Sequence, residues 1–332
     1  MIQLRKRKIV WVFAILCLIA FAGTTYQRIR ASEDAKRFPQ VGQRVDVGGR
    51  TLNLNCSGKG EPTVIFESTH GVPGLAWNGV QSQISSLVRT CWYDRAGYGW
   101  SDEGPSPRHS NEIARDLHVL LKNAGISPPY ILVGHGFGAF NVRAFRGLYP
   151  EEVKGMVLAD APSDDADPRN PTVPPKKHIE ALRPAVIVMF RIVGELGLLR
   201  LLQSPSEAPP GFSPVEWQTI QALMIQPKSV EARVQETPLF ESAIQVRAAG
   251  SLGDMPLIVV SPEPQQGDAR GRLKLAYQSA LVKLSTDGKQ VIVPHVRGVW
   301  WPYSAPEMVE SIIRVLKECQ RNRSGEAAAT SS

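Results

Sequence analysis

Cysteine is scarce in this chain, which has only 4 cysteines among 332 residues. The cysteines and the 6 histidines do not fall at any zinc-type spacing, which excludes a zinc finger or a zinc ribbon. The sequence also lacks an internal repeat, so it does not describe a solenoid or a propeller. We therefore expect neither a bound metal nor a cofactor.

What is present is the composition of an ordinary globular protein, 43% hydrophobic and 21% charged. The length allows one large α/β domain with an insertion, or two smaller domains. The net charge is +7, but the basic residues are spread along the chain and several stand beside its first apolar segment. Membrane topology explains that placement, and we expect no nucleic-acid partner.

The N-terminus predicts a membrane segment. A basic cluster at residues 5–8 precedes an uninterrupted apolar run at residues 9–23, as in a signal peptide or a signal anchor. The apolar run reaches the lower limit of length for spanning a bilayer if residues 24–26 are included, and we favour an uncleaved anchor with the domain on the extracytoplasmic, periplasmic side. The small residues around Ala22 also fit a cleavage site, and cleavage after Ala22 would give a secreted protein.

Two cysteines are candidates for a disulfide. Cys56 ends one predicted strand, residues 51–55, and Cys91 begins another, residues 91–94. If these strands are antiparallel neighbours, the two thiols lie side by side and can be bridged. The alternative is a pair of buried free thiols.

The middle of the chain alternates between strand-like and helix-like segments. Residues 41–47 and 51–55 flank a Gly-Gly pair and predict a β-hairpin. Residues 130–133 and 156–159 are fully apolar strands, separated by a helical segment. This order predicts an α/β fold, a mainly parallel sheet with helices on both faces.

The alternation stops after Asp160 and resumes at residues 257–260. We expect a helical lid between them, in which the apolar stretch at residues 184–202 packs over a pocket and touches the membrane surface, since its three charges argue against a transmembrane span. The predicted division is a membrane segment at 1–26, a linker at 27–40, a core domain at 41–161 and 251–320, a lid at 162–250 and a disordered tail at 321–332.

Three glycines outline a motif that normally carries a nucleophile. A buried strand runs into Gly134-His135-Gly136-Phe137-Gly138 and then into a helix, which is the context of a nucleophile elbow. Together with residues 45–50 and 93–102, this motif resembles the α/β-hydrolase superfamily, and in particular its N-terminally anchored bacterial members. The resemblance extends over residues 38–316, with a looser match in the lid.

The resemblance implies a catalytic serine and a catalytic histidine, and both positions are substituted. The elbow holds Gly136, which has no nucleophilic atom. The stretch at residues 297–307 aligns without a gap with the segment that carries the family's histidine, and it places Val299 there. The acid position falls on Asp160 or on Asp268, and an ordinary loop carboxylate is an equal alternative for either.

The resemblance also implies an oxyanion hole built from backbone N–H groups. These map to Phe137 and to the His70-Gly71-Val72 region, and they need no particular side chain. A site able to hold a carboxylate or carbonyl oxygen is therefore expected to survive. His295 is the best substitute for the missing base.

Three functions follow from this sequence. The first is a non-catalytic protein outside the membrane that binds a small apolar or anionic ligand or a protein partner. The second is a hydrolase of esters, amides or epoxides that uses rearranged groups. The third is a structural subunit of a membrane complex with a vestigial pocket. An open pocket beside Gly136 favours the first, and a filled one favours the third.

Overall fold

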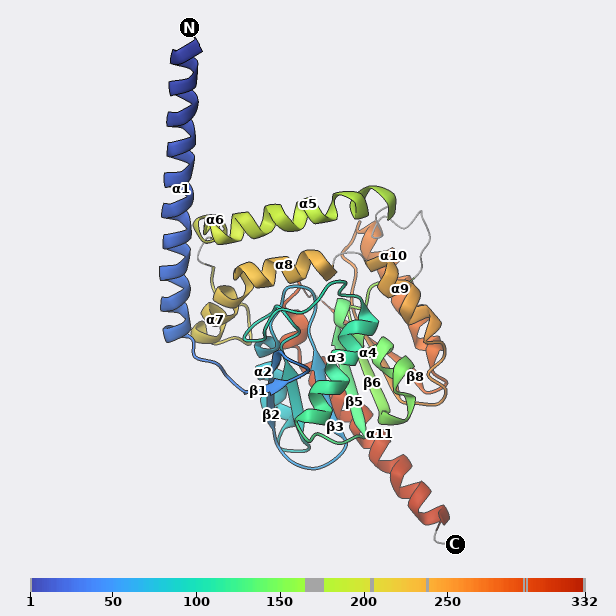
Figure 1. The fold of residues 1–332 in the computed structure, drawn as a ribbon. Helices are drawn as coiled ribbons and strands as arrows, with labels where there is room; N and C mark the ends of the chain where they lie inside the picture. Colours follow the sequence, from blue (N-terminus) through green and yellow to red (C-terminus); the bar gives the residue numbers. More distant parts are fainter. Residues whose placement is uncertain are drawn as a thin grey trace.

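The computed structural model describes residues 2–164, 176–203, 206–236, 239–294, 296 and 298–330. A long N-terminal helix stands beside an α/β domain, and a layer of further helices lies over one edge of that domain's sheet (Figure 1). The mainly parallel sheet predicted from the sequence is confirmed.

The sheet has eight strands in the order β1-β2-β4-β3-β5-β6-β7-β8. β2 runs antiparallel to β1 and β4, and the other pairings are parallel. The central strands β3 and β5 are buried along their whole length, which is why the runs 64–66 and 131–133 inside them are continuously apolar rather than alternating. The strands are β1 Gln43–Asp46, β2 Thr51–Ser57, β3 Thr63–Glu67, β4 Thr90–Tyr93, β5 Tyr130–His135, β6 Val153–Ala159, β7 Leu257–Pro262 and β8 Gly288–Val293.

Helices cover both faces of the sheet and divide the hydrophobic core in two. One cluster joins the sheet to α3 and α4, and the other joins it to α2 and α11. The helices of the core domain are α2 Asn78–Ile84, α3 Ser110–Asn123, α4 Phe137–Leu148, α10 Ala269–Leu281 and α11 Pro306–Thr330, with short 3-10 turns at Gly74–Trp77, Pro150–Glu152, Val282–Leu284 and Trp301–Tyr303.

A helical insertion separates β6 from β7, at the place where the sequence predicted a lid. It contains α5 Lys176–Glu195, α6 Leu198–Leu202, α7 Pro214–Met224, α8 Pro227–Glu236 and α9 Leu239–Ala248. Because β6 ends at the carboxyl edge of the sheet, the insertion begins there. α5 and α8 lie one above the other over that edge (Figure 1).

Two segments differ from the sequence prediction. Residues 27–37, expected to be part of a linker, continue helix α1, which runs over Ile2–Arg37. The helix persists because the insertion holds it: Arg200 donates from Nε to Gln27 at 2.8 Å and forms an ion pair with Asp34 at 2.5 Å. At the other end, α11 continues to Thr330 through the segment expected to be disordered, where its Ala-rich sequence favours helix.

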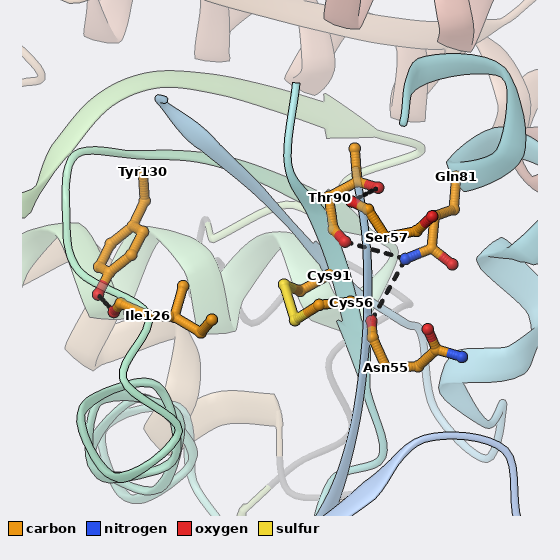
Figure 2. Close-up of a disulfide and its surroundings, with 8 residues drawn as sticks. All are labelled: Asn55, Cys56, Ser57, Gln81, Thr90, Cys91, Ile126 and Tyr130. Atoms are coloured by element: carbon orange, nitrogen blue, oxygen red, sulfur yellow. Dashed lines mark hydrogen bonds between the residues drawn. A yellow bond between two sulfur atoms is a disulfide. The ribbon is translucent and has the colours of Figure 1, made fainter. Parts of the chain in front are cut away.

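The two candidate cysteines lie opposite each other on neighbouring antiparallel strands. The register pairs Cys56 of β2 with Cys91 of β4, and the two form a disulfide with 4.1 Å between their Cα atoms (Figure 2). The side chain of Gln81 donates to the backbone of both strands beside the bridge, at Asn55 O and Thr90 O. The disulfide therefore joins the antiparallel edge of the sheet to its parallel part.

Helix α1 is long and apolar enough to cross a membrane. Residues Lys6–Arg37 contain a window of mean hydropathy 2.2, and the side chains in that window are not buried against the rest of the molecule. Figure 1 shows that the N-terminal half of α1 extends beyond the insertion without touching it. A membrane-spanning segment is thus supported by length, composition and exposure.

Candidate functional site: the elbow and its surroundings

Gly136 occupies the sharp turn between β5 and α4. Its backbone angles are φ 53° and ψ −122°, a combination that glycine adopts freely and that strains other residues by about 1–3 kcal/mol. The glycine two positions later is required by packing, since a Cβ on Gly138 would approach Glu67 O at 2.5 Å. The elbow predicted from the glycine pattern is therefore formed, with its special backbone conformation intact.

Thr69 fills the space in which a side chain at position 136 would begin. A Cβ added to Gly136 would lie 2.9 Å from Thr69 Cβ and closer still to Thr69 Oγ1. Rotating the threonine hydroxyl away would leave the overlap with its Cβ, so the backbone itself would have to move. Thr69 is almost buried, with 9% of its surface exposed. A serine at the elbow does not fit this arrangement.

The same threonine meets one of the two expected oxyanion-hole groups. The N–H of Phe137 points at Thr69 Oγ1 at 3.4 Å. The other expected group, the His70-Gly71 segment, is covered: the guanidinium of Arg233 lies where a Gly71 side chain would be. One backbone donor of the predicted hole thus faces a side chain of this chain, and Arg233 lies against the segment expected to supply the other.

The histidines next to these positions have partners other than the elbow. His135 Nδ1 lies 2.9 Å from the hydroxyl of Tyr303, which also receives the N–H of Thr69 at 3.4 Å. Burial lowers the pKa of His135 to about 3. His70 stacks on Phe137 with 4.1 Å between ring centroids, and its Nε2 lies 3.1 Å from the backbone oxygen of Glu236. Burial also lowers the pKa of His70.

A buried ion-pair network connects the insertion to the Thr69 loop. Arg95 pairs with Glu67 at 2.6 Å and with Glu236 of α8 at 2.8 Å, and all three side chains are nearly inaccessible. The same guanidinium donates to the backbone oxygens of Ser68 and Thr69 at 2.6 and 3.0 Å. One cation therefore fixes both the end of α8 and the loop that blocks the elbow.

The pKa values of the two carboxylates in this network are shifted in opposite directions. Burial raises the pKa of Glu67 although Arg95 opposes the shift. At Glu236 burial also acts to raise the pKa, but the charge and hydrogen bonds of Arg95, with smaller contributions from His70 and Arg108, lower the pKa below its ordinary value. Glu67 also accepts hydrogen bonds from Tyr93 and Asn141, and Glu236 accepts one from Tyr98. Removing Arg95 would leave buried carboxylates without their counter-ion.

The two candidate acids and the loop that carries Val299 line a cavity to which Gly136, Thr69 and Phe137 do not contribute. Asp160 and Asp268 line a cavity of about 480 Å³ together with Gly298 and Trp301 of the loop that carries Val299. Asp160 forms an ion pair with Lys274 at 2.7 Å and accepts from Gln278 at 3.2 Å. Asp268 caps α10 by accepting from the Gly271 N–H at 2.9 Å.

Val299 itself is 42% exposed. Its side chain has no atom that accepts or donates a proton, so nothing at this position serves as a base. His295 lies outside the described residues. In the part of the chain that the structure describes, no group of acidic, histidine or cysteine side chains is arranged to hold a metal.

Thr69 and Tyr303 were not identified from the sequence. A signal for Thr69 existed in the strand pairing: β3 and β5 are parallel neighbours with Glu67 opposite Gly134. Continuing both chains by two residues brings Thr69 beside Gly136. Tyr303 offers no comparable signal, because its hydroxyl reaches the elbow through the fold of a loop.

Comparisons with known proteins agree with this architecture. A sequence model described as alpha/beta hydrolase fold matches residues 66–186. The structure of a thermophilic esterase from Thermogutta terrifontis superposes with a TM-score of 0.62 and 17% identity, covering 84% of this chain and 99% of that chain. At this identity the likeness concerns the fold alone.

Two curated relatives share part of the chain. An uncharacterized protein of Bacillus subtilis is 29% identical over 157 residues, which are 46% of this chain and 48% of that protein. An uncharacterized vacuolar membrane protein of Saccharomyces cerevisiae is 31% identical over 121 residues, 35% of this chain and 19% of that protein. The matched part of this chain spans less than half the length of either relative.

Proposed function

Since this chain is a member of the α/β-hydrolase superfamily, we propose that it is a membrane-tethered interaction protein that uses the fold without its hydrolytic chemistry. The ligand-binding and scaffold hypotheses differ in whether the elbow is open.

The position of Thr69 against Gly136 carries the proposal. Substitution of a nucleophile by glycine removes an atom, but the elbow would stay open if nothing else changed. Here the threonine occupies the space of the missing side chain and receives the Phe137 N–H. A substrate oxygen that accepts a hydrogen bond from that N–H has to displace the hydroxyl of Thr69. This supports a filled elbow, and therefore a role in contacts with other proteins rather than capture of a substrate.

The surroundings support the same conclusion. Hydrolysis by this fold requires a base that takes the proton of the nucleophile, and Val299 cannot do so. His135 and His70 are buried, and their pKa values are lowered. The network of Arg95 with Glu67 and Glu236 fastens α8 over the site, whereas a working lid has to move.

We further propose that the domain lies on the extracytoplasmic side of the membrane. The basic residues before the apolar part of α1 favour a cytoplasmic N-terminus. The Cys56–Cys91 disulfide is typical of proteins in oxidising compartments. Both observations support a domain outside the membrane, with the apolar half of α1 as its anchor.

Turnover of a series of p-nitrophenyl esters by the full-length protein in nanodiscs tests the loss of catalysis. We expect rates equal to those of a Thr69→Val variant, which keeps the shape of the side chain and removes its hydroxyl. Turnover at the rate of an ordinary esterase that disappears in Thr69→Val would overturn the proposal and make Thr69 a nucleophile. The same loss in His295→Ala would identify a displaced base.

A further inference from the structure

One side of helices α5 and α6 is apolar and exposed. Six side chains on it are between 41% and 78% exposed. They are Val188, Met189, Ile192, Leu198, Leu201 and Leu202, and we call them the outer face. A cluster of exposed apolar side chains on one side of two consecutive helices marks a contact with another apolar phase.

The other side of α5 is already in contact with the protein. Gly194 is buried against Pro227 at the start of α8, with 3.1 Å between Pro227 Cα and the place of a Gly194 Cβ. Arg191 reaches Glu231 of α8 at 3.8 Å. The packing of α5 on α8 therefore turns the outer face away from the domain.

Contacts with α1 fix the position of the outer face along that helix. The backbone oxygen of Leu196 lies 2.9 Å from the place of a Gly23 Cβ, and Tyr26 packs against Gly197. Arg200 holds α1 further along, at Gln27 and Asp34. Figure 1 shows α5 roughly perpendicular to α1, with its α6 end beside α1 at this level and the N-terminal half of α1 alone extending beyond it.

The length of that free half matches a bilayer. From Ile9 to Tyr26 an α-helix rises about 26 Å, close to the roughly 30 Å of a hydrocarbon core. When this stretch of α1 spans the membrane, Gly23 and Tyr26 are near the boundary between acyl chains and headgroups. The turn between α5 and α6 contacts α1 at Gly23 and Tyr26, so both helices are held at the same boundary.

We propose that the outer face of α5 and α6 lies in the membrane interface, so that the bilayer surface is its partner. The helices then resemble an interfacial amphipathic helix, with apolar side chains toward the acyl chains and Arg191 and Glu195 at the headgroups. The carboxyl edge of the sheet, with the closed elbow, faces the membrane. The opposite edge, near Leu87, faces away from it.

This inference rests on the membrane tether of the proposed function, and spin labels at single cysteines separate the two. We would label Ile192→Cys, Leu201→Cys and, as a control, Leu87→Cys, each in a Cys17→Ala background and reconstituted as full-length protein in bilayers. Leu87 is 53% exposed, so it is as apolar and accessible as the test positions. Native Cys17, labelled in the unsubstituted protein, reports on the tether.

We expect labels at 192, 201 and 17 to collide readily with oxygen and poorly with a water-soluble nickel chelate, and the label at 87 to show the reverse. If 192 and 201 behave like 87 while Cys17 is in lipid, the inference is wrong and the tether stands. If 192 and 201 are shielded from both reagents, a protein covers the outer face and the inference is also wrong. A water-exposed label at Cys17 would refute the tether itself.

Discussion

Thr69 and Gly136 lie side by side at the carboxyl edge of the sheet, and the threonine occupies the place of the side chain that the glycine lacks. The parallel register of β3 and β5, with Glu67 opposite Gly134, produces this contact. Glycine also relieves the backbone strain of the turn, where φ is 53°. The substitution and the filling of the elbow thus belong to one arrangement, and they can be tested as a pair.

Gly136→Ser should destabilise the protein through the strained backbone, by about 1–3 kcal/mol, and through overlap with Thr69, by about 1–3 kcal/mol more. Thr69→Gly in the same chain removes the overlap and should recover that second part. Urea unfolding of both single variants and the double variant measures the coupling. Additive effects would mean that Thr69 does not fill the elbow.

Arg95→Met should lower the free energy of unfolding by about 3–5 kcal/mol, because it leaves two buried carboxylates without their cation. Glu236→Gln keeps the shape of the side chain, so its smaller loss should concentrate in α8 and increase hydrogen exchange there. The exposed pair Arg115–Glu112 is the control, and Arg115→Met should cost less than about 1 kcal/mol. Equal losses at Arg95 and Arg115 would contradict the role of the network.

The sequence predicted what depends on local pattern. The hairpin at Gly48-Gly49, the elbow around Gly136 and the helical insertion after Asp160 follow from glycines, strand periodicity and the loss of alternation, and the structure contains all three. Contacts between distant segments were not predicted. The contact of Thr69 with Gly136 can be predicted only from the register of two strands. The ion pair of Glu236 with Arg95 can be predicted only from the position of a helix in the insertion.

Stability should fall as the pH decreases below neutrality because of His135. Its pKa in the folded protein is lowered to about 3 by burial, against an ordinary value of 6.5. Between these pH values the His135 imidazole binds a proton in the unfolded chain but not in the folded protein. Its contribution to stability is therefore fully present above pH 6.5 and is lost as the pH falls toward 3. From pH 7 to 5 this amounts to about 2 kcal/mol.

Denaturant unfolding of the wild type and of His135→Asn at pH 7 and 5 checks this dependence. The asparagine retains a polar group toward Tyr303 but does not titrate in this range. We expect the variant to lose about 2 kcal/mol less than the wild type over the interval. Parallel losses in both proteins would show that other groups set the pH dependence.

Replacing Cys56 and Cys91 together by alanine should reduce stability by about 3–4 kcal/mol, because the bridge closes a loop in the unfolded chain; their sequence separation is 35. Thiol labelling of protein taken from its native membrane provides the second measurement. Cys319 is buried and its pKa is raised to about 12, so it should react only after unfolding. Labelling of Cys56 and Cys91 without a reductant would contradict an oxidising compartment.

Restoring hydrolysis should require three changes rather than two. Gly136→Ser with Val299→His supplies a nucleophile and a base, which act as a unit and give little separately. Thr69 would still overlap the serine and hold the Phe137 N–H, so we expect the double variant to remain nearly inactive. Adding Thr69→Gly frees the space and the N–H, and the triple variant should hydrolyse short p-nitrophenyl esters.

The matched control is the triple variant with Gly136→Ala in place of serine, which has the same strained backbone and a Cβ but no hydroxyl. Activity that is present in the triple variant with Gly136→Ser and absent from the triple variant with Gly136→Ala identifies the restored serine as the nucleophile. Asp160 is available to orient the new imidazole only if it leaves Lys274, its present partner at 2.7 Å. Lys274→Ala should therefore raise the activity of the triple variant with Gly136→Ser. If the double variant is as active as the triple, Thr69 does not close the elbow, and the loss of catalysis lies in the two substitutions alone.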